Sequence, residues 1–207
     1  MYNELYTIYD TNQKFTQSTV HKLSNHTRRW GTPIFNNGSR NRLQYTCGLS
    51  TQRTIVDVML KTTTFLNRQY PMHIANNWAV LHSTRNCPRQ PAHSDYHPDI
   101  LDDAHTLPLF AILAIASGTT IDIWLDDHDT AVSVLSTKNP VARRVTIELQ
   151  EGELFIGRAD LIHAGSDYSE PNTRFHVFLD TPEVERPVDR TYLIELDDNF
   201  TNLEDCV

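Results

Sequence analysis

From Asn76 onward the sequence consists of short β-rich segments separated by Gly, Pro and Asp turns, and this pattern limits the folds open to the chain. In residues 120–125 and 144–149 every second residue is apolar, as in a strand with one buried face. Short strands at this spacing favour an all-β sandwich or barrel over βαβ units. Several segments are apolar on both faces, which fits a sheet that closes round a core and is covered by helices. The segments expected to be strands are 78–82, 109–116, 120–125, 144–149, 153–156, 161–162 and 174–179.

The first 75 residues differ from this β-rich part. Residues 1–50 are polar and turn-rich, whereas apolar residues recur at near-helical spacing from 51 to 70, where Pro71 supplies a stop. The second segment is therefore expected to be one amphipathic helix packed on a larger body. Together these patterns predict a mainly β fold, a double-stranded β-helix (jelly-roll or cupin-like), with helical N-terminal support. We expect one domain over 1–207, made of an N-terminal support and candidate lid (1–75), a β-helix core (76–180) and a C-terminal strand with an acidic tail (181–207).

Composition narrows the class of protein further. The chain has no apolar run near the ~20 residues that a membrane helix needs, and Met1–Glu4 lacks the basic and apolar pattern of a secretory signal. The three cysteines, Cys47, Cys87 and Cys206, have unrelated spacings, which argues against a disulfide framework, a thiolate zinc site and a cysteine nucleophile. These features predict a soluble intracellular domain without a membrane partner.

The net charge of −8 is unevenly distributed along the chain. Residues 1–75 contain nine Lys or Arg against three Asp or Glu, a local charge of +6, so the remaining residues carry −14. Overall acidity argues against general nucleic-acid coating, and the sequence has no RRM, zinc-finger or helix-turn-helix signature. The basic N-terminal third is either a solvated surface or a region that attracts an anionic partner or substrate.

Two His-x-Asp pairs stand close together, His93-Ser94-Asp95 and His97-Pro98-Asp99. Because the chain has ten histidines, chance alone gives roughly one such pair, so the surroundings must decide between them. The first pair follows a strand-like segment and a loop with two prolines. The second contains a proline, which suits a hydrogen-bonded strand poorly. Sixty-eight residues after Asp95, His163 stands near the end of the Gly-punctuated β segment 151–165.

These residue types, in this order, fit one metal ion. Residues i and i+2 of an extended segment point the same way, so His93 and Asp95 can reach one ion, and His163 from a neighbouring strand adds a third ligand. Two imidazoles and one carboxylate suit Fe(II) and leave three coordination positions open. The alternatives are a surface turn at the His-x-Asp pair and a rim histidine, bonded to a backbone carbonyl, at position 163.

Arg174 opens the last core strand, eleven residues after His163. In an extended segment it shares one face with His176, while the residue between them points the other way. A guanidinium on a strand that is apolar on both sides is costly to bury without a partner. That partner is either an anionic ligand or an internal carboxylate, for which Asp160 and Asp180 are the candidates.

The order of these residues resembles the Fe(II)/2-oxoglutarate-dependent dioxygenase superfamily over residues 76–180. The spacing of eleven from His163 to Arg174 is similar to that of the phytanoyl-CoA hydroxylase branch. AlkB-type repair enzymes have a longer gap and a second Arg where this chain has Asp180. The resemblance implies that the His-Asp-His set holds Fe(II), that 2-oxoglutarate chelates the iron, and that the arginine binds the distal carboxylate of this cosubstrate.

The resemblance also implies a reaction. O2 and 2-oxoglutarate would be consumed to hydroxylate or oxidatively demethylate a primary substrate, with succinate and CO2 as coproducts. That substrate is a small molecule, a protein side chain or a nucleic-acid base, since the fold serves all three. Two other classes fit the same barrel: a cupin-like metalloenzyme that does not use 2-oxoglutarate, and a non-catalytic binding protein.

Several further residues are weaker candidates, each with a purely structural alternative. His82 and Thr84 share a strand face and either bond the cosubstrate or line the core. Tyr96 either forms a wall of the substrate pocket or packs at the rim. The others are His176 as a donor behind the metal ligands, Gln90 as a residue that orients the metal-binding loop, and Arg40, Arg42 and Gln44 in a polar N-terminal loop that either folds over the mouth or is solvated.

Overall fold

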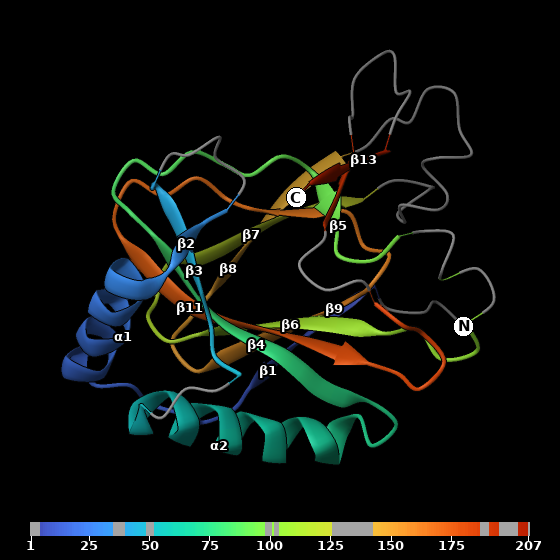
Figure 1. The fold of residues 1–207 in the computed structure, drawn as a ribbon, viewed down its shortest axis with the longest axis horizontal. Helices are drawn as coiled ribbons and strands as arrows, with labels where there is room; N and C mark the ends of the chain where they lie inside the picture. Colours follow the sequence, from blue (N-terminus) through green and yellow to red (C-terminus); the bar gives the residue numbers. More distant parts are fainter. Residues whose placement is uncertain are drawn as a thin grey trace.

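The computed structural model describes residues 5–34, 40–48, 52–97, 101, 104–125, 143–186, 191–194 and 203–206. Its strands form two sheets, in which the paired strands are antiparallel (Figure 1). The seven-stranded major sheet has the order β1 (Tyr6–Asp10), β9 (Glu153–Arg158), β6 (Leu109–Ala114), β11 (Asn172–Asp180), β4 (Ile74–Ser83), β3 (Arg42–Thr46) and β2 (Thr32–Pro33). The six-stranded minor sheet has the order β13 (Leu203–Cys206), β12 (Thr191–Ile194), β5 (His93–Ser94), β10 (His163–Gly165), β7 (Thr119–Leu125) and β8 (Arg143–Leu149).

The chain passes from one sheet to the other at almost every connection between β4 and β11. Strands β4, β6, β9 and β11 belong to the major sheet and β5, β7, β8 and β10 to the minor sheet, so only β7 and β8 follow each other within one sheet. This alternation is the winding of a double-stranded β-helix, and the predicted mainly β, jelly-roll fold is confirmed. The expected segment 161–162 is the least accurate of the strand predictions, because it immediately precedes β10.

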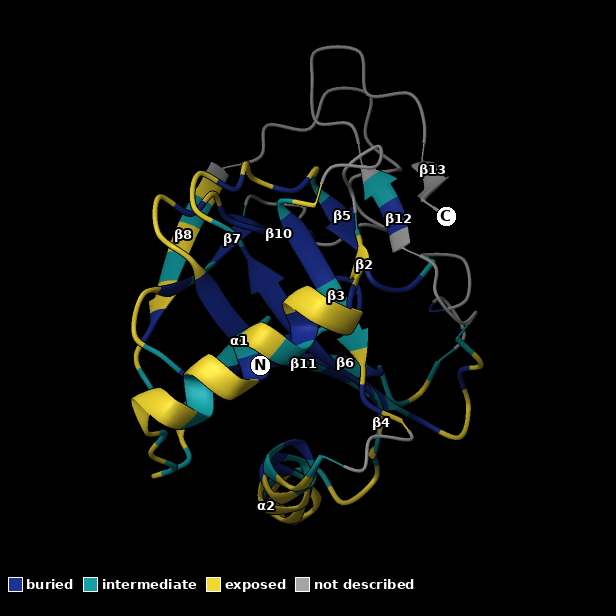
Figure 2. Ribbon diagram, turned by 60° about the vertical axis from the view of Figure 1, so that its left-hand side comes forward, coloured by how far each residue is buried: buried dark blue, intermediate teal, exposed yellow. Residues whose placement is uncertain are grey.

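Two helices, α1 (Gln17–Trp30) and α2 (Arg53–Gln69), lie on the outer face of the major sheet (Figures 1 and 2). Helix α2 is the amphipathic helix expected from residues 51–70. Helix α1 lies in the polar, turn-rich segment for which no helix is expected. It begins after Thr16, whose hydroxyl accepts a hydrogen bond from the backbone N–H of Thr19 at 3.2 Å. In the described part of the chain, neither helix has the length and apolar character needed to span a bilayer.

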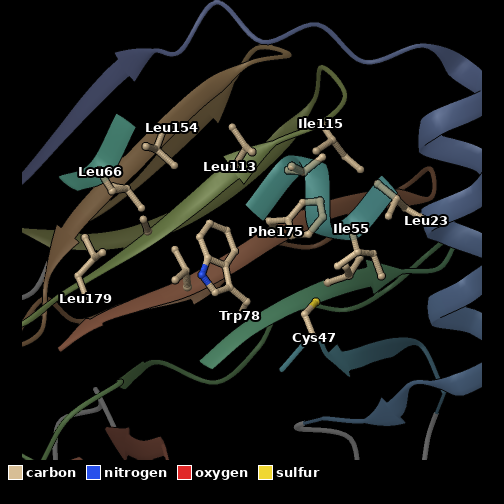
Figure 3. Close-up of a cluster of buried hydrophobic side chains, with 14 of the residues drawn as sticks. Leu23, Cys47, Ile55, Leu66, Trp78, Leu113, Ile115, Leu154, Phe175 and Leu179 are labelled. Carbon is tan, nitrogen blue, oxygen red and sulfur yellow. The ribbon is translucent and has the colours of Figure 1, made fainter. Parts of the chain in front are cut away.

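The two larger clusters of buried apolar residues lie on opposite sides of the major sheet. The outer cluster joins the helices to the sheet, with Leu23 of α1 and Ile55 of α2 near Phe175 of β11 (Figure 3). The inner cluster lies between the two sheets and includes Phe110 of β6. Because side chains alternate along a strand, Phe175 points to the helices while its neighbour Arg174 points into the space between the sheets.

The N-terminal third supplies strands as well as helices. Strand β1 pairs with β9, and β2 and β3 extend the major sheet beyond β4. The expectation of a polar loop at Arg42 and Gln44 is therefore wrong, because both lie in β3, and pairing with β4 leaves Arg42 only 1% exposed. Arg40 precedes this strand and is exposed. It donates hydrogen bonds of 3.2 and 3.5 Å to two backbone carbonyls at the end of α1, so the structure places it against that helix.

Candidate metal centre

His93, Asp95 and His163 lie together on neighbouring strands. The register of β5 and β10 pairs His93 directly with His163, and Asp95 follows β5. The ligand atoms of the three residues all lie within 4.8 Å of one another, and all three residues are buried. The His163 Nε2 is 3.7 Å from Asp95 Oδ2, and the two imidazole centroids are 4.4 Å apart. The structure thus brings together the three expected ligands, whereas Pro98 and Asp99 of the alternative pair lie outside the described residues.

Both imidazoles are oriented by a carbonyl two residues earlier in the chain. The Nδ1–H of His93 donates to the carbonyl of Pro91 at 2.8 Å, and the Nδ1–H of His163 donates to the carbonyl of Leu161 at 3.0 Å. Because a carbonyl oxygen only accepts, each ring carries its proton on Nδ1 and presents Nε2 as its lone-pair nitrogen. Metal-binding histidines are typically oriented in this way by a second partner.

The charges of the cluster match those of a metal-binding set. Burial lowers the pKa of His93 to about 3, with repulsion from His163 adding to it, and burial also lowers the pKa of His163. Burial by itself would raise the pKa of Asp95, but the facing imidazoles of His163 and His176 outweigh this and hold that pKa below its ordinary value. Two neutral nitrogen donors and one carboxylate therefore face one another at neutral pH, and this is the deprotonated state that metal ligands must have.

The cluster has an aromatic wall and a further polar partner. The ring of Phe110 stacks on His163 with centroids 4.1 Å apart and an interplanar angle of 18°. His176 of β11 places its Nε2 3.3 Å from Asp95 Oδ2, and its ring lies 4.6 Å from that of Phe178. His176 is thus positioned to donate a hydrogen bond to the carboxylate and to fix its direction.

Arg174 faces the space between the sheets from β11 and is 1% exposed. Its Nη1 donates to Ser83 Oγ at 3.1 Å and to Asn172 Oδ1 at 3.5 Å, and its guanidinium carbon lies 5.1 Å from the centroid of the Tyr168 ring. These three neighbours were not among the expected site residues. Asn172 is two residues before Arg174 in β11, so strand alternation alone would place both side chains on the same face. No feature of the sequence indicates that Tyr168 lies beside Arg174.

Neither internal carboxylate considered for Arg174 pairs with it. Asp160 pairs with Arg158 at 2.7 Å, and Asp180 lies 3.5 Å from Arg186. Within the described ranges, Arg174 has no carboxylate at ion-pair distance. The interpretation of Arg174 as half of an internal ion pair is therefore not supported.

Two side chains fasten the loop before the His-x-Asp pair to the strand that carries the distal histidine. The Oε1 of Gln90 accepts from the backbone N–H of Gly165 at 2.6 Å, and the Gln90 backbone N–H donates to the Gly165 carbonyl at 3.0 Å. The Nη2 of Arg42 donates to the carbonyls of Pro88, Gly165 and Ser166 at 3.1, 3.3 and 2.8 Å. Gln90 is thus positioned for the orienting role expected of it.

His82 lies on the face of β4 that points to the helices, opposite the face from which Ser83 contacts Arg174. Its Nδ1 is 2.8 Å from Thr173 Oγ1 and 3.3 Å from Ser24 Oγ of α1, so the ring points toward the helix. It lines a pocket of about 370 Å³ beside α1 that contains none of the three candidate metal ligands. Thr84 follows β4 and donates to a nearby backbone carbonyl at 3.3 Å. The expectation that His82 and Thr84 bond a cosubstrate is therefore not supported, and Ser83 takes the position facing Arg174.

The position of His82 gives a prediction for stability. Burial, with Arg28 and Arg174 adding to it, lowers the pKa of His82 to about 4 from its ordinary 6.5. Between pH 4 and 6.5, His82 binds a proton in the unfolded chain but not in the folded chain. The buried neutral imidazole therefore has no effect on the pH dependence of stability above 6.5, and it lowers the free energy of unfolding as the pH falls toward 4. Between these two pH values, the free energy of unfolding of the wild-type protein is expected to fall more steeply with decreasing pH than that of His82→Gln. The difference between the two slopes is at most about 1.4 kcal/mol per pH unit, the effect of one proton. Urea unfolding across the window measures both slopes, and equal slopes would contradict the prediction.

Tyr96 is completely buried next to Asp95. Its hydroxyl donates to Asp180 Oδ1 at 2.6 Å, and its ring packs edge-on against Phe178 with centroids 6.0 Å apart. Burial, together with the charge of Asp180, raises the pKa of Tyr96 above its ordinary value. The structure thus shows a packed aromatic residue with a bonded hydroxyl, and the expected role of Tyr96 in a substrate pocket stays a prediction.

Comparisons of sequence give no family for this chain. No protein-family model matches it, and no curated protein is significantly similar to it.

Comparisons of structure give a clear fold. The epimerase SnoN, in complex with Fe3+, alpha ketoglutarate and nogalamycin RO, has a TM-score of 0.58 at 12% identity, over 85% of this chain and 79% of SnoN. HygX from Streptomyces hygroscopicus, with nickel and 2-oxoglutarate bound, has a TM-score of 0.58 at 9% identity, over 86% of this chain and 83% of HygX. A prolyl-4-hydroxylase from Pseudomonas putida has a TM-score of 0.54 at 11% identity, over 86% of this chain and 94% of that enzyme. The chain therefore has the double-stranded β-helix fold of these enzymes.

Proposed function

We propose that the chain is an Fe(II)- and 2-oxoglutarate-dependent oxygenase, in which His93, Asp95 and His163 hold the iron and Arg174 holds the cosubstrate. One observation carries this proposal. A buried His-Asp-His cluster lies in the same barrel as a buried arginine that has no carboxylate partner among the described residues. The reaction proposed is hydroxylation of a C–H bond in the primary substrate, or removal of an N-methyl group that has been hydroxylated. The shared fold supports the proposal.

The residues present fit both groups. When bound together, iron and 2-oxoglutarate supply the oxidising chemistry: O2 gives one oxygen atom to succinate as 2-oxoglutarate loses CO2, and the other to the substrate C–H bond. The single carboxylate of Asp95 offsets only part of the charge of a dication, so the site stays attractive to an anion. The planar fork of Arg174 suits a carboxylate at a fixed distance better than a lysine would.

The chain's own residues have three tasks in this proposal. The carbonyls behind His93 and His163 fix the tautomer in which Nε2 is the ligand atom, and His176 fixes the direction of Asp95. The stacked ring of Phe110 keeps water from one side of His163. An anionic primary substrate, expected from the basic N-terminal third, stays a prediction.

Succinate formation under ¹⁸O2 tests the proposed function. We expect the full-length protein with Fe(II) and 2-oxoglutarate to form succinate that carries one ¹⁸O atom, with a cell extract as a source of primary substrate. No ¹⁸O-labelled succinate is expected from Asp95→Ala, because the metal would lose the one carboxylate of the His-Asp-His set, and no new succinate is expected without O2. Metal binding without consumption of 2-oxoglutarate would favour a cupin-like metalloenzyme instead. If the protein neither bound a metal ion nor consumed 2-oxoglutarate, a non-catalytic binding protein would be favoured.

A further inference from the structure

Two buried arginines lie side by side in this barrel. Arg42 of β3 and Arg174 of β11 are each 1% exposed, and their guanidinium carbons lie 5.6 and 5.1 Å from the centroid of the same Tyr168 ring. Both also approach Gly165: a Cβ built on this glycine would lie 2.5 Å from Arg42 Nη1 and 3.2 Å from Arg174 Nη2. The two guanidiniums therefore flank one point of β10, and a side chain at this position would collide with Arg42.

Among the described residues, the hydrogen-bond partners of these two arginines are backbone carbonyls, a hydroxyl and an amide oxygen, none of which is charged. Arg42 uses Nη2 for three backbone carbonyls, while its buried Nη1 has no hydrogen-bond partner among the described residues. Arg174 uses Nη1 for the hydroxyl of Ser83 and the amide oxygen of Asn172. The nearby buried acid Asp122 lies 3.8 Å from Arg89 and 3.7 Å from Arg144 instead.

The buried guanidiniums of Arg42 and Arg174 repel each other, and an anion between them would offset this repulsion. Burial, with repulsion from Arg174 adding to it, lowers the pKa of Arg42 to about 10, while Cys87 and Tyr168 partly offset this. Arg42 is thus still protonated at neutral pH, and two positive charges share a buried site without a described counter-charge. Burying a charge is costly unless it is paired, and a carboxylate between the two guanidiniums would supply that pair.

We propose that Arg42 and Arg174 together form the subsite for the distal carboxylate of the cosubstrate, with Arg42 Nη1 as the second donor. This inference rests on the proposed function, because 2-oxoglutarate is the dicarboxylate it assigns to the site. It gives Arg42, which comes from the N-terminal third, a direct part in cosubstrate recognition. The alternative is that Arg42 only fastens backbone segments through its three carbonyl contacts.

A comparison of two ligands separates these roles. Isothermal titration of the full-length protein, loaded with Mn(II) and kept without O2, measures the affinity for 2-oxoglutarate and for 2-oxopentanoate. The second compound has the same chelating head and carbon chain but no distal carboxylate. We expect the ratio of the two affinities to fall about tenfold or more in Arg42→Met, the effect of one lost charge-assisted hydrogen bond. Arg42→Lys, which keeps the charge, is expected to retain part of the ratio.

The outcomes are distinct. If Arg42→Met weakens both ligands equally and leaves the ratio unchanged, Arg42 is only a structural clamp and the inference is overturned. If the wild-type protein binds neither ligand, the proposed function itself fails. Should Arg42→Met not fold, a crystal structure of the wild-type protein with Mn(II) and 2-oxoglutarate decides. A distal carboxylate within about 4 Å of nitrogens of both arginines supports the inference, and one that is this close only to Arg174 overturns it.

Discussion

Replacing His163 by alanine is expected to lower the affinity for a divalent metal ion on the order of 100-fold or more. The imidazole is one of the three ligands proposed among the described residues, and even residues that merely support a ligand typically affect metal affinity by about 10–100-fold. Its neighbour in the register, His93, would be left with Asp95 as the only other proposed ligand among the described residues. Titration of the metal-free protein with Mn(II), followed by electron paramagnetic resonance of the free ion, measures the affinity.

A histidine outside the cluster gives the matched control. His82 is as well buried as His163 but lies on the opposite face of the major sheet, against α1. We therefore expect His82→Ala to bind Mn(II) like the wild-type protein. An equal loss in both variants would mean that a general loss of packing, and not the loss of a ligand, lowers the affinity. Unchanged binding by His163→Ala would exclude the proposed metal centre.

The second large effect is expected at Arg174. In the Mn(II)-loaded protein, Arg174→Met should weaken binding of 2-oxoglutarate about 100-fold, because it removes the fork proposed to hold the distal carboxylate and would leave the bound charge without its main partner. Binding of 2-oxopentanoate, which lacks this carboxylate, should change little. Isothermal titration without O2 measures both affinities.

Arg85 offers the control for this variant. It is an exposed arginine whose only described ion pair is with Glu170 at 2.7 Å, on the surface. Arg85→Met should leave both affinities unchanged, since an exposed pair contributes little. If Arg174→Met weakened the two ligands to the same extent, its role would be to support the barrel and not to recognise a carboxylate.

The fold could be predicted from the sequence where strand patterns are strong. Alternating or continuous apolar segments identify the core strands, and the near-helical recurrence of apolar residues from Ile55 to Tyr70 made α2 predictable. Of these apolar residues, Ile55 and Leu66 are among the buried residues of the helix. Helix α1 could not be predicted in the same way, because Leu23 is its only completely buried hydrophobic residue and most of its other positions are polar. Its stability depends on the sheet against which it packs, which a local pattern does not contain.

The site could be predicted only as far as residue types and spacing allow. The order of His93, Asp95, His163 and Arg174 was enough to select the residues that the structure brings into one barrel. The orientation of His82 was not predictable, because β4 is buried on both faces and alternation then does not tell the inner face from the outer one. The position of Arg42 depends on pairing between strands that are distant in sequence.

In the proposed function, one site holds both a metal ion and the chelating end of 2-oxoglutarate. Anaerobic titration of the metal-free protein with Fe(II), and then with 2-oxoglutarate, tests this most directly by visible absorption. We predict a weak charge-transfer band that appears only when both are present, saturates at one equivalent of each, persists in His82→Ala and is lost in His163→Ala. Absence of the band in the wild-type protein, or an equal band in His163→Ala, would exclude a shared site built on His163.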